Sequence, residues 1–451
     1  MKSNLTLPPS PDLAGLLRRL AKLLQTNIEE LKTKNQIQTQ VIARMKTRVT
    51  SFNYDKGNVS WGAHHVQEAV TRRAISDQHA FLENTIKTDM AYANALKALS
   101  AHANVSEDQA NQWLMHFCTR FIKDYLDTFD DETAYRIIDI FQRDIDSVPA
   151  WMGMSVGLTG IWIEGDDFNV GNLCFRKPNE RDVEVHSDTM FYGFVQLPNC
   201  FLEFNYKATQ PIEAQNESQF YTTVLLLAGL GSVKAVTTRI SNQSVIRGVG
   251  SSSHSALDGS AQFRFSICKA DSEFLGQLFK NLRGPLTNNN PSDTLKAIKR
   301  AFSRYQAAVD RPQDYPSTIA LAISSIEALF LRGAERSELA NRLSNRVAVL
   351  FRTLGRNPIQ TRNLVGRAYE IRSTFIHGDD APSDRNADLQ QVCEGVLDIA
   401  RNSLLILFQV EPRVTKEDLI SRLDNALLDE KASERLKELL EENPIQLPRL
   451  K

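Results

Sequence analysis

The hydrophobic positions in the first third of the chain follow helical periods. Two sets of apolar residues recur at heptad spacing near its start: Leu17, Leu24, Leu31 and Met45, with Ile28, Ile42 and Val49 in the companion position. This pattern predicts one long helix over residues 11–49. Because Asn35 and Gln38 interrupt the apolar seam, we expect a helix packed on its own domain rather than a coiled coil. Helical spacing resumes after residue 62 and continues to about residue 145.

The pattern changes near residue 150, where short runs rich in β-branched and aromatic residues alternate with Gly, Pro, Asn and Asp. These runs continue to about residue 270: LTGIWIEG, FYGFVQLP, CFLEFNYKA, VKAVTTRI, SVIRGVG and AQFRFSICKA. Such runs are typical of the strands of an antiparallel sheet or sandwich. The hexapeptide RDVEVH at 181–186 is also expected to be strand or loop. The polar stretch RGPLTNNNPSDTL then predicts a linker and a domain boundary.

Four or five amphipathic helices are predicted beyond the linker. One begins at Pro316 and ends at Gly333, and the next two end at Gly355 and Gly378, as expected from the preference of helices for proline at the start and glycine at the end. A charged segment that opens on Thr415 completes the chain as further helix.

The predicted fold class is therefore an α+β multidomain protein. It comprises a helical N-terminal region (1–148), a β-rich domain (149–285), an all-α bundle (292–412) and a charged helical tail (413–451).

Composition and charge narrow the possible functions. The chain carries 53 basic and 54 acidic residues, so a protein that coats nucleic acid non-specifically is excluded and any nucleic-acid contact must be local. The five cysteines are scattered, which argues against a disulfide framework or a zinc site and for a reducing compartment. Neither a signal peptide nor an apolar run of membrane-spanning length is recognisable, so we expect a soluble cytoplasmic protein with no membrane contact.

Arginine is concentrated in one stretch of the predicted bundle. Nine arginines lie between residues 332 and 372, against three glutamates and no lysine. Guanidinium binds phosphate in a bidentate manner, so an arginine-only basic stretch suits an RNA backbone. Arg342, Arg346 and Arg367 are candidates for RNA contact or structural support. For any single arginine, pairing with a glutamate or simple solvation of a helix face is the competing interpretation.

The same stretch ends in EIRSTFIHGDD, which combines an arginine and a histidine at a helix end. The spacing of Arg372 and His377 is not informative by itself, because Arg181 and His186 repeat it. Within a helix the two side chains would diverge by about 140°. A helix that ends at Gly378 allows the imidazole to leave the axis and approach the arginine, and a helix C-terminus favours a protonated imidazole.

Three segments in this order resemble one protein family. SIEALF, SELANRLSNRVAVLF and YEIRSTFIHG are similar to the Apea-like branch of the HEPN superfamily, over roughly residues 292–410. The family motif is an arginine, a polar residue, a few further residues and a histidine, which corresponds here to Arg372, Ser373 and His377. Serine departs from the Asn, Asp or His that is commoner across the superfamily, although it is familiar in this branch.

The resemblance implies a ribonuclease that needs no metal or other cofactor. The ribose 2′-hydroxyl attacks its own phosphodiester, with His377 transferring a proton, Arg372 stabilising the phosphate and Ser373 orienting either group. It also implies a homodimer in which two motif helices face each other, an RNA substrate such as a tRNA loop, and a toxin or antiviral defence role. Residues 1–285 would sense a trigger ligand or protein, or restrain the nuclease.

Two other functions remain open from the sequence. The chain could be a non-catalytic HEPN module that binds RNA, a nucleotide or a protein, or a purely structural helical adaptor. Glu327 falls on the apolar side of its helix, and we expect it to brace Arg342 or Arg346 rather than to act in catalysis. The adjacent His64 and His65 have no carboxylate or cysteine at metal-ligand spacing.

Overall fold

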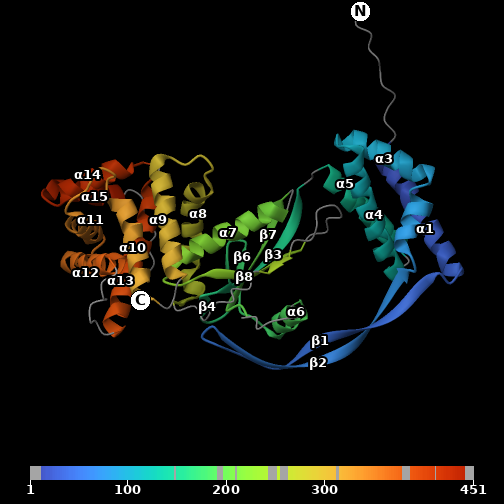
Figure 1. Cartoon of the computed structure of the whole chain (residues 1–451), viewed down its shortest axis with the longest axis horizontal. Coiled ribbons are helices and arrows are strands. Elements are labelled where there is room, and N and C mark those ends of the chain that lie inside the picture. Colours follow the sequence, from blue (N-terminus) through green and yellow to red (C-terminus); the bar gives the residue numbers. More distant parts are fainter. Residues whose placement is uncertain are drawn as a thin grey trace, which may run out of the picture.

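The chain folds into mixed helix and sheet. A computed structural model describes residues 12–128, 130–146, 149–189, 197–208, 211–241, 251–253, 263–310, 314–377, 386–411 and 413–441. Figure 1 shows an N-terminal helical body, a central sheet and a C-terminal helical region, with a long two-stranded arm running between the first two.

The N-terminal body is a helical bundle with its own core. Its elements are α1 (Leu13–Thr33), α2 (Gln78–Phe81), η1 (Leu82–Ile86), α3 (Met90–Ala103), α4 (Glu107–Thr128) and α5 (Asp131–Ile145). Leu17 and Leu24 of the predicted heptad are fully buried in this core, together with Phe117 and Phe141. The apolar face of α1 therefore packs within its own bundle.

The predicted helix over 11–49 is wrong beyond residue 33, and the helical structure predicted after residue 62 is wrong as far as residue 75. Strands β1 (Ile37–Asp55) and β2 (Asn58–Ile75) instead form a long antiparallel hairpin. Asn35 ends the helical region with a positive φ of 56°, and Lys56 and Gly57 both have positive φ at the tip. Positive φ at both central residues is the geometry of a two-residue type I′ turn, which matches the twist of paired strands.

The tip of this arm is bound to the central sheet region. The Tyr54 hydroxyl donates to the Asn199 carbonyl at 2.9 Å and accepts from the Ile163 amide at 3.2 Å. The Asn199 side chain in turn donates to the Gly57 carbonyl at 2.6 Å. Burial of the phenol raises the pKa of Tyr54 to about 12. At its other end the arm is held by Arg73, which donates to the Leu126 carbonyl at 3.3 Å.

The central sheet has six strands in the order β5-β6-β7-β3-β8-β9, all paired antiparallel, as predicted. Its strands are β3 (Ala150–Thr159), β5 (Phe168–Val170), β6 (Leu173–Arg176), β7 (Cys200–Ala208), β8 (Lys234–Ser241) and β9 (Ser251–Ser253). Strands β4 (Ile161–Ile163) and β10 (Phe265–Ile267) form a separate parallel pair. Helices α7 (Pro211–Ala228) and α8 (Ser272–Thr287), with the short η2 (Lys269–Asp271) before α8, complete this region (Figure 1).

Four sequence predictions in this region need correction or lie outside the described residues, and one helix was not predicted. RDVEVH belongs to helix α6 (Glu180–Thr189), with no strand at that position. Helix α7 was not predicted, because its apolar run is short and lies among strand-like runs. Helix α8 continues through Pro285 into the predicted linker. SVIRGVG and most of FYGFVQLP lie outside the described residues.

The C-terminal region is helical, as predicted. It consists of α9 (Asp293–Val309), α10 (Tyr315–Phe330), α11 (Leu339–Thr353), α12 (Pro358–His377), α13 (Asn386–Val410), α14 (Lys416–Ala426) and α15 (Glu430–Glu441). These helices share one continuous core with the sheet, in which Phe330, Phe351 and Phe408 are fully buried beside residues of α7 and β3. The charged tail belongs to this core through Leu423 and Leu436.

Candidate functional site

Arg372 lies on α12 and contacts α10. Its Nη2 forms an ion pair with Glu327 Oε2 at 3.1 Å, and its Nε lies 3.5 Å from the Ser324 hydroxyl. The guanidinium also stands over the Tyr369 ring, 5.4 Å from the ring centroid. The Arg372 side chain keeps 22 % of its surface exposed.

The prediction that Glu327 pairs with Arg342 or Arg346 is wrong. Its partner is Arg372, because α10 packs against α12 on the side where Glu327 lies. Burial raises the pKa of Glu327, and the neighbouring Arg372 and Arg304 counteract part of that shift. The Glu327 carboxylate is costly to bury and is stabilised by neighbouring cations. It therefore holds Arg372 in place.

His377 and Ser373 lie on the outward side of the same helix. His377 is the last residue of α12 and is exposed, and Ser373 is partly exposed. With 3.6 residues per turn, Arg372, Ser373 and His377 fall within a sector of about 140° around the axis. Arg372 lies at the edge next to the core and His377 at the edge in solvent. The turn predicted at Gly378 lies outside the described residues.

A large apolar side chain is exposed within this sector. Ile376 is 56 % exposed and by helical geometry falls between Arg372 and Ser373. The neighbouring Phe375 is 44 % exposed. Exposed isoleucine and phenylalanine at the end of a helix, beside the motif residues, form a surface suited to another protein chain.

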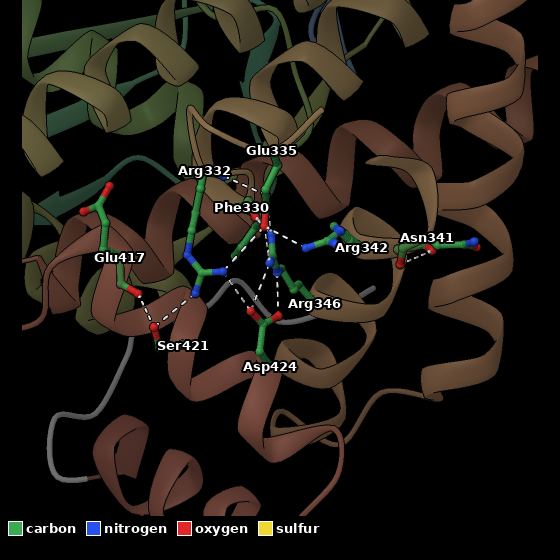
Figure 2. Close-up of polar contacts among 10 residues, drawn as sticks. Phe330, Arg332, Glu335, Asn341, Arg342, Arg346, Glu417, Ser421 and Asp424 are labelled. Carbon is green, nitrogen blue, oxygen red and sulfur yellow. Dashed lines mark hydrogen bonds and ion pairs between the residues drawn. The ribbon is translucent and has the colours of Figure 1, made fainter. Parts of the chain in front are cut away.

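Arg346, a candidate for RNA contact or structural support, is a buried structural group. Its side chain is only 3 % exposed, and all five of its N–H donors are bonded (Figure 2). Nη1 and Nη2 bind the Glu335 carboxylate at 2.9 and 2.6 Å, and Nε and Nη2 bind Asp424 at 2.7 and 3.0 Å. The remaining Nη1 donor binds the Phe330 carbonyl at 2.8 Å. No donor is left for a phosphate.

Most of the arginine-rich stretch serves the same purpose of holding helices together. Arg342 contributes to the network through Glu335 at 3.4 Å, and Arg332 reaches Asp424 at 3.1 Å. Further intramolecular bonds are made by Arg336 to Gly333, Arg352 to Ala426 and Arg356 to Asp398. Arg332, Arg346 and Arg352 thus bind α14, Arg356 binds α13, and Arg336 bonds within the loop before α11. Arg367 is exposed on α12.

Sequence reasoning missed two residues of the site. Ser324 lies one helical turn before Glu327, and Tyr369 lies one turn before Arg372. The Tyr369 hydroxyl hydrogen-bonds Glu327, and burial raises the pKa of Tyr369. The only sequence signal for Ser324 and Tyr369 was their spacing of three residues from Glu327 and Arg372.

Metal-ligating groups do not cluster in the described ranges: no set of three or more His, Cys, Asp or Glu side chains there could hold an ion. Within those ranges, too, no helix is long and apolar enough to cross a bilayer. Comparison of the chain with models of protein families, with curated proteins and with solved structures gives no match.

Proposed function

We propose that the chain is an endoribonuclease of the HEPN type, with Arg372, Ser373 and His377 as its catalytic residues. The observation that carries the proposal is the end of α12, where an arginine fixed by Glu327 shares one exposed sector with a solvent-facing histidine. A positioned cation and a solvent-facing imidazole at the same helix end are the minimum that transesterification of RNA requires.

The proposed reaction is an in-line displacement at phosphorus. The 2′-oxygen forms a bond to phosphorus, the bond to the 5′-oxygen breaks, and the products carry a 2′,3′-cyclic phosphate and a 5′-hydroxyl. One proton leaves the 2′-hydroxyl and one arrives on the 5′-oxygen. His377 takes one of these proton transfers, and Arg372 stabilises the charge on the non-bridging phosphate oxygens.

A second copy of the chain would supply the other proton transfer. Because Ile376 lies between Arg372 and Ser373, two α12 helices that meet through Ile376 place two arginines and two histidines in one cleft. A symmetric contact of this kind uses the same apolar surface from both protomers.

Replacement of Ile376 with aspartate is expected to convert a dimer into a monomer and to remove most of the cleavage activity, because two carboxylates would face each other across the axis. Sedimentation velocity measures the mass, and an RNA assay measures the activity. Ile359→Asp is the matched control, since Ile359 is 69 % exposed at the other end of the same helix. Dimerisation that persists in Ile376→Asp, or is lost equally in Ile359→Asp, contradicts this interface.

Cleavage of RNA is expected to require the 2′-hydroxyl and to persist in EDTA. The test uses total RNA to locate a cleaved nucleotide, then a short RNA with a single 2′-deoxy substitution at that nucleotide. We expect loss of the product at that position, since the nucleophile is gone. The same deoxy substitution two nucleotides away is the control. Undiminished cleavage of the deoxy substrate, or cleavage that depends on added divalent ions, rejects the mechanism.

One observation favours the alternative of a non-catalytic binding module. The Arg372–Glu327 ion pair occupies part of the guanidinium, as a purely structural brace would. In that case Glu327→Gln would leave RNA binding unchanged and no RNA would be cleaved under any condition. If Arg372 acts on phosphate, Glu327→Gln is expected to change the cleavage rate.

A further inference from the structure

One face of the central sheet carries an exposed tryptophan among polar side chains. Residues of β3 alternate between the two faces, and Met152 and Met154 point into the core shared with α7. Trp151 lies on the opposite face and is 68 % exposed. Trp151 is the second residue of β3, so this large exposed ring lies near the end of a central strand, where it is open to a ligand.

The strand register defines the surroundings of this ring. Lys207 of β7 pairs directly with Trp151, and Asn205 pairs with Gly153. On the other side of β3, Ser241 of β8 also pairs with Gly153. Because paired residues of antiparallel strands point to the same face, these side chains share the face of the tryptophan. Lys207, Asn205 and Ser241 are all exposed.

Gly153 keeps the sheet surface flat beside the ring. A Cβ atom at this position would lie 2.5 Å from the Ser241 hydroxyl and 3.5 Å from the Asn205 amide oxygen. Because Gly153 has no side chain, the surface next to Trp151 consists of backbone and short polar groups. A planar group stacked on the indole therefore meets no side chain from β3 at the next position on this face.

Two cations lie on this face: Lys207 directly opposite the tryptophan, and Arg239 farther along the sheet. Arg239 of β8 pairs with Ser155 of β3, so it lies on the same face and is exposed. Neither Lys207 nor Arg239 makes an ion pair with any residue in the described part of the chain. The neighbouring Glu203 is bound to Arg176 at 2.9 Å. Within the described residues these two cations have no carboxylate partner, and together with the aromatic ring on the same face they favour an anionic ligand that carries a planar group.

We propose that this face binds single-stranded RNA, with a base stacked on Trp151 and the adjoining phosphates held by Lys207 and Arg239. Antiparallel sheets that display an aromatic ring bind unpaired bases in this way, because every base has a face to stack and the backbone needs only cations. The choice of RNA rests on the proposed ribonuclease function, whereas the stacking site itself does not. The face would hold a substrate strand at a distance from the end of α12.

The test measures binding separately from cleavage. The full chain with His377→Ala is titrated with a fluorescein-labelled oligouridine of about twelve nucleotides, a length within the range that single-strand sites occupy. We expect Trp151→Ala to weaken binding about tenfold or more and to abolish the quenching of tryptophan emission. Lys207→Ala and Arg239→Ala are each expected to reduce the slope of log affinity against log salt by about 0.7.

Two controls distinguish this site from general charge attraction. Trp61 is 43 % exposed on the arm, and Trp61→Ala is expected to leave binding unchanged. A duplex of the same length is expected to bind more weakly than the single strand, because its bases are already stacked. The proposal is overturned if Trp151→Ala binds the oligouridine within twofold of its His377→Ala parent. It is also overturned if uridine monophosphate competes as well as unlabelled oligouridine. Trp151-dependent binding without cleavage by the wild type would reject the ribonuclease function and retain the site.

Discussion

Replacement of His377 with alanine is expected to remove RNA cleavage, with a loss of about 10²–10⁴ in rate, the range that one positioned acid or base supplies. Arg372→Ala is expected to cost about 10²–10³, comparable to the loss of one charge-stabilising donor. Both variants are assayed on the same RNA as the wild type, with gel resolution of the products. In a dimer with two copies of each residue in one cleft, the two losses should not add.

Arg181→Ala and His186→Ala provide matched controls for this experiment. They repeat the same residue types at the same spacing on α6, in another part of the fold. Both are expected to cleave at the wild-type rate. Equal loss in the control pair, or full activity in His377→Ala, contradicts the assignment.

Arg372→Ala needs a second variant, because it also removes the ion-pair partner of the half-buried Glu327. In the double variant with Glu327→Gln a neutral amide replaces that carboxylate, so the cost of burying an unpaired charge is relieved. Cleavage is expected to stay lost while the thermal transition returns toward that of the wild type. Recovery of cleavage in the double variant would show that Arg372 is only a structural partner of Glu327.

The C-terminal helices could be predicted from sequence because their boundaries are marked by local chemistry. Asp314 caps α10 with its side chain and Thr415 caps α14 in the same way, and helical spacing of apolar residues continues between such caps. The arm could not be predicted in this way. Ile42 and Val49 fit a heptad and a strand equally well, and the deciding signal was the turn at Lys56 and Gly57, which requires positive φ.

The candidate site, too, could be predicted from the sequence only in part. The position of His377 at the end of a helix could be predicted from the glycine that follows it in the sequence. The partner of Glu327 does not, because nine arginines lie within 41 consecutive residues (332–372) and only the packing of α10 on α12 selects Arg372. Likewise, nothing local distinguishes the fully bonded Arg346 from the exposed Arg367. Which arginine contacts which acid depends on contacts between residues far apart in sequence.

Replacement of Arg346 with alanine is expected to destabilise the C-terminal region by about 3 kcal/mol, the low end of the cost of breaking a buried ion pair. Glu335 is 9 % exposed and would lose its shortest ion pair, although Arg342 and Arg332 still lie within 3.5 Å. Because the network joins α14 to α11, we expect amide hydrogen exchange in α14 to accelerate about 100-fold. Arg336→Ala, which removes bonds to backbone carbonyls only, is the control and should change exchange little.

The same network predicts an acid-sensitive stability that is reduced in the variant. Hydrogen bonds from Arg346, with further help from Arg332, hold the pKa of Glu335 at about 2, well below its usual value. Since a depressed carboxyl pKa stabilises the fold only while the group is ionised, its contribution is complete above about pH 4.5 and is lost as the pH falls toward 2. A shift of this size corresponds to roughly 3 kcal/mol. The difference in stability between wild type and Arg346→Ala should therefore shrink between pH 4.5 and pH 2, as measured by hydrogen exchange in α14. A difference that stays constant over this range would show that Arg346 stabilises the helices through packing and its bond to Phe330, without help from the Glu335 charge.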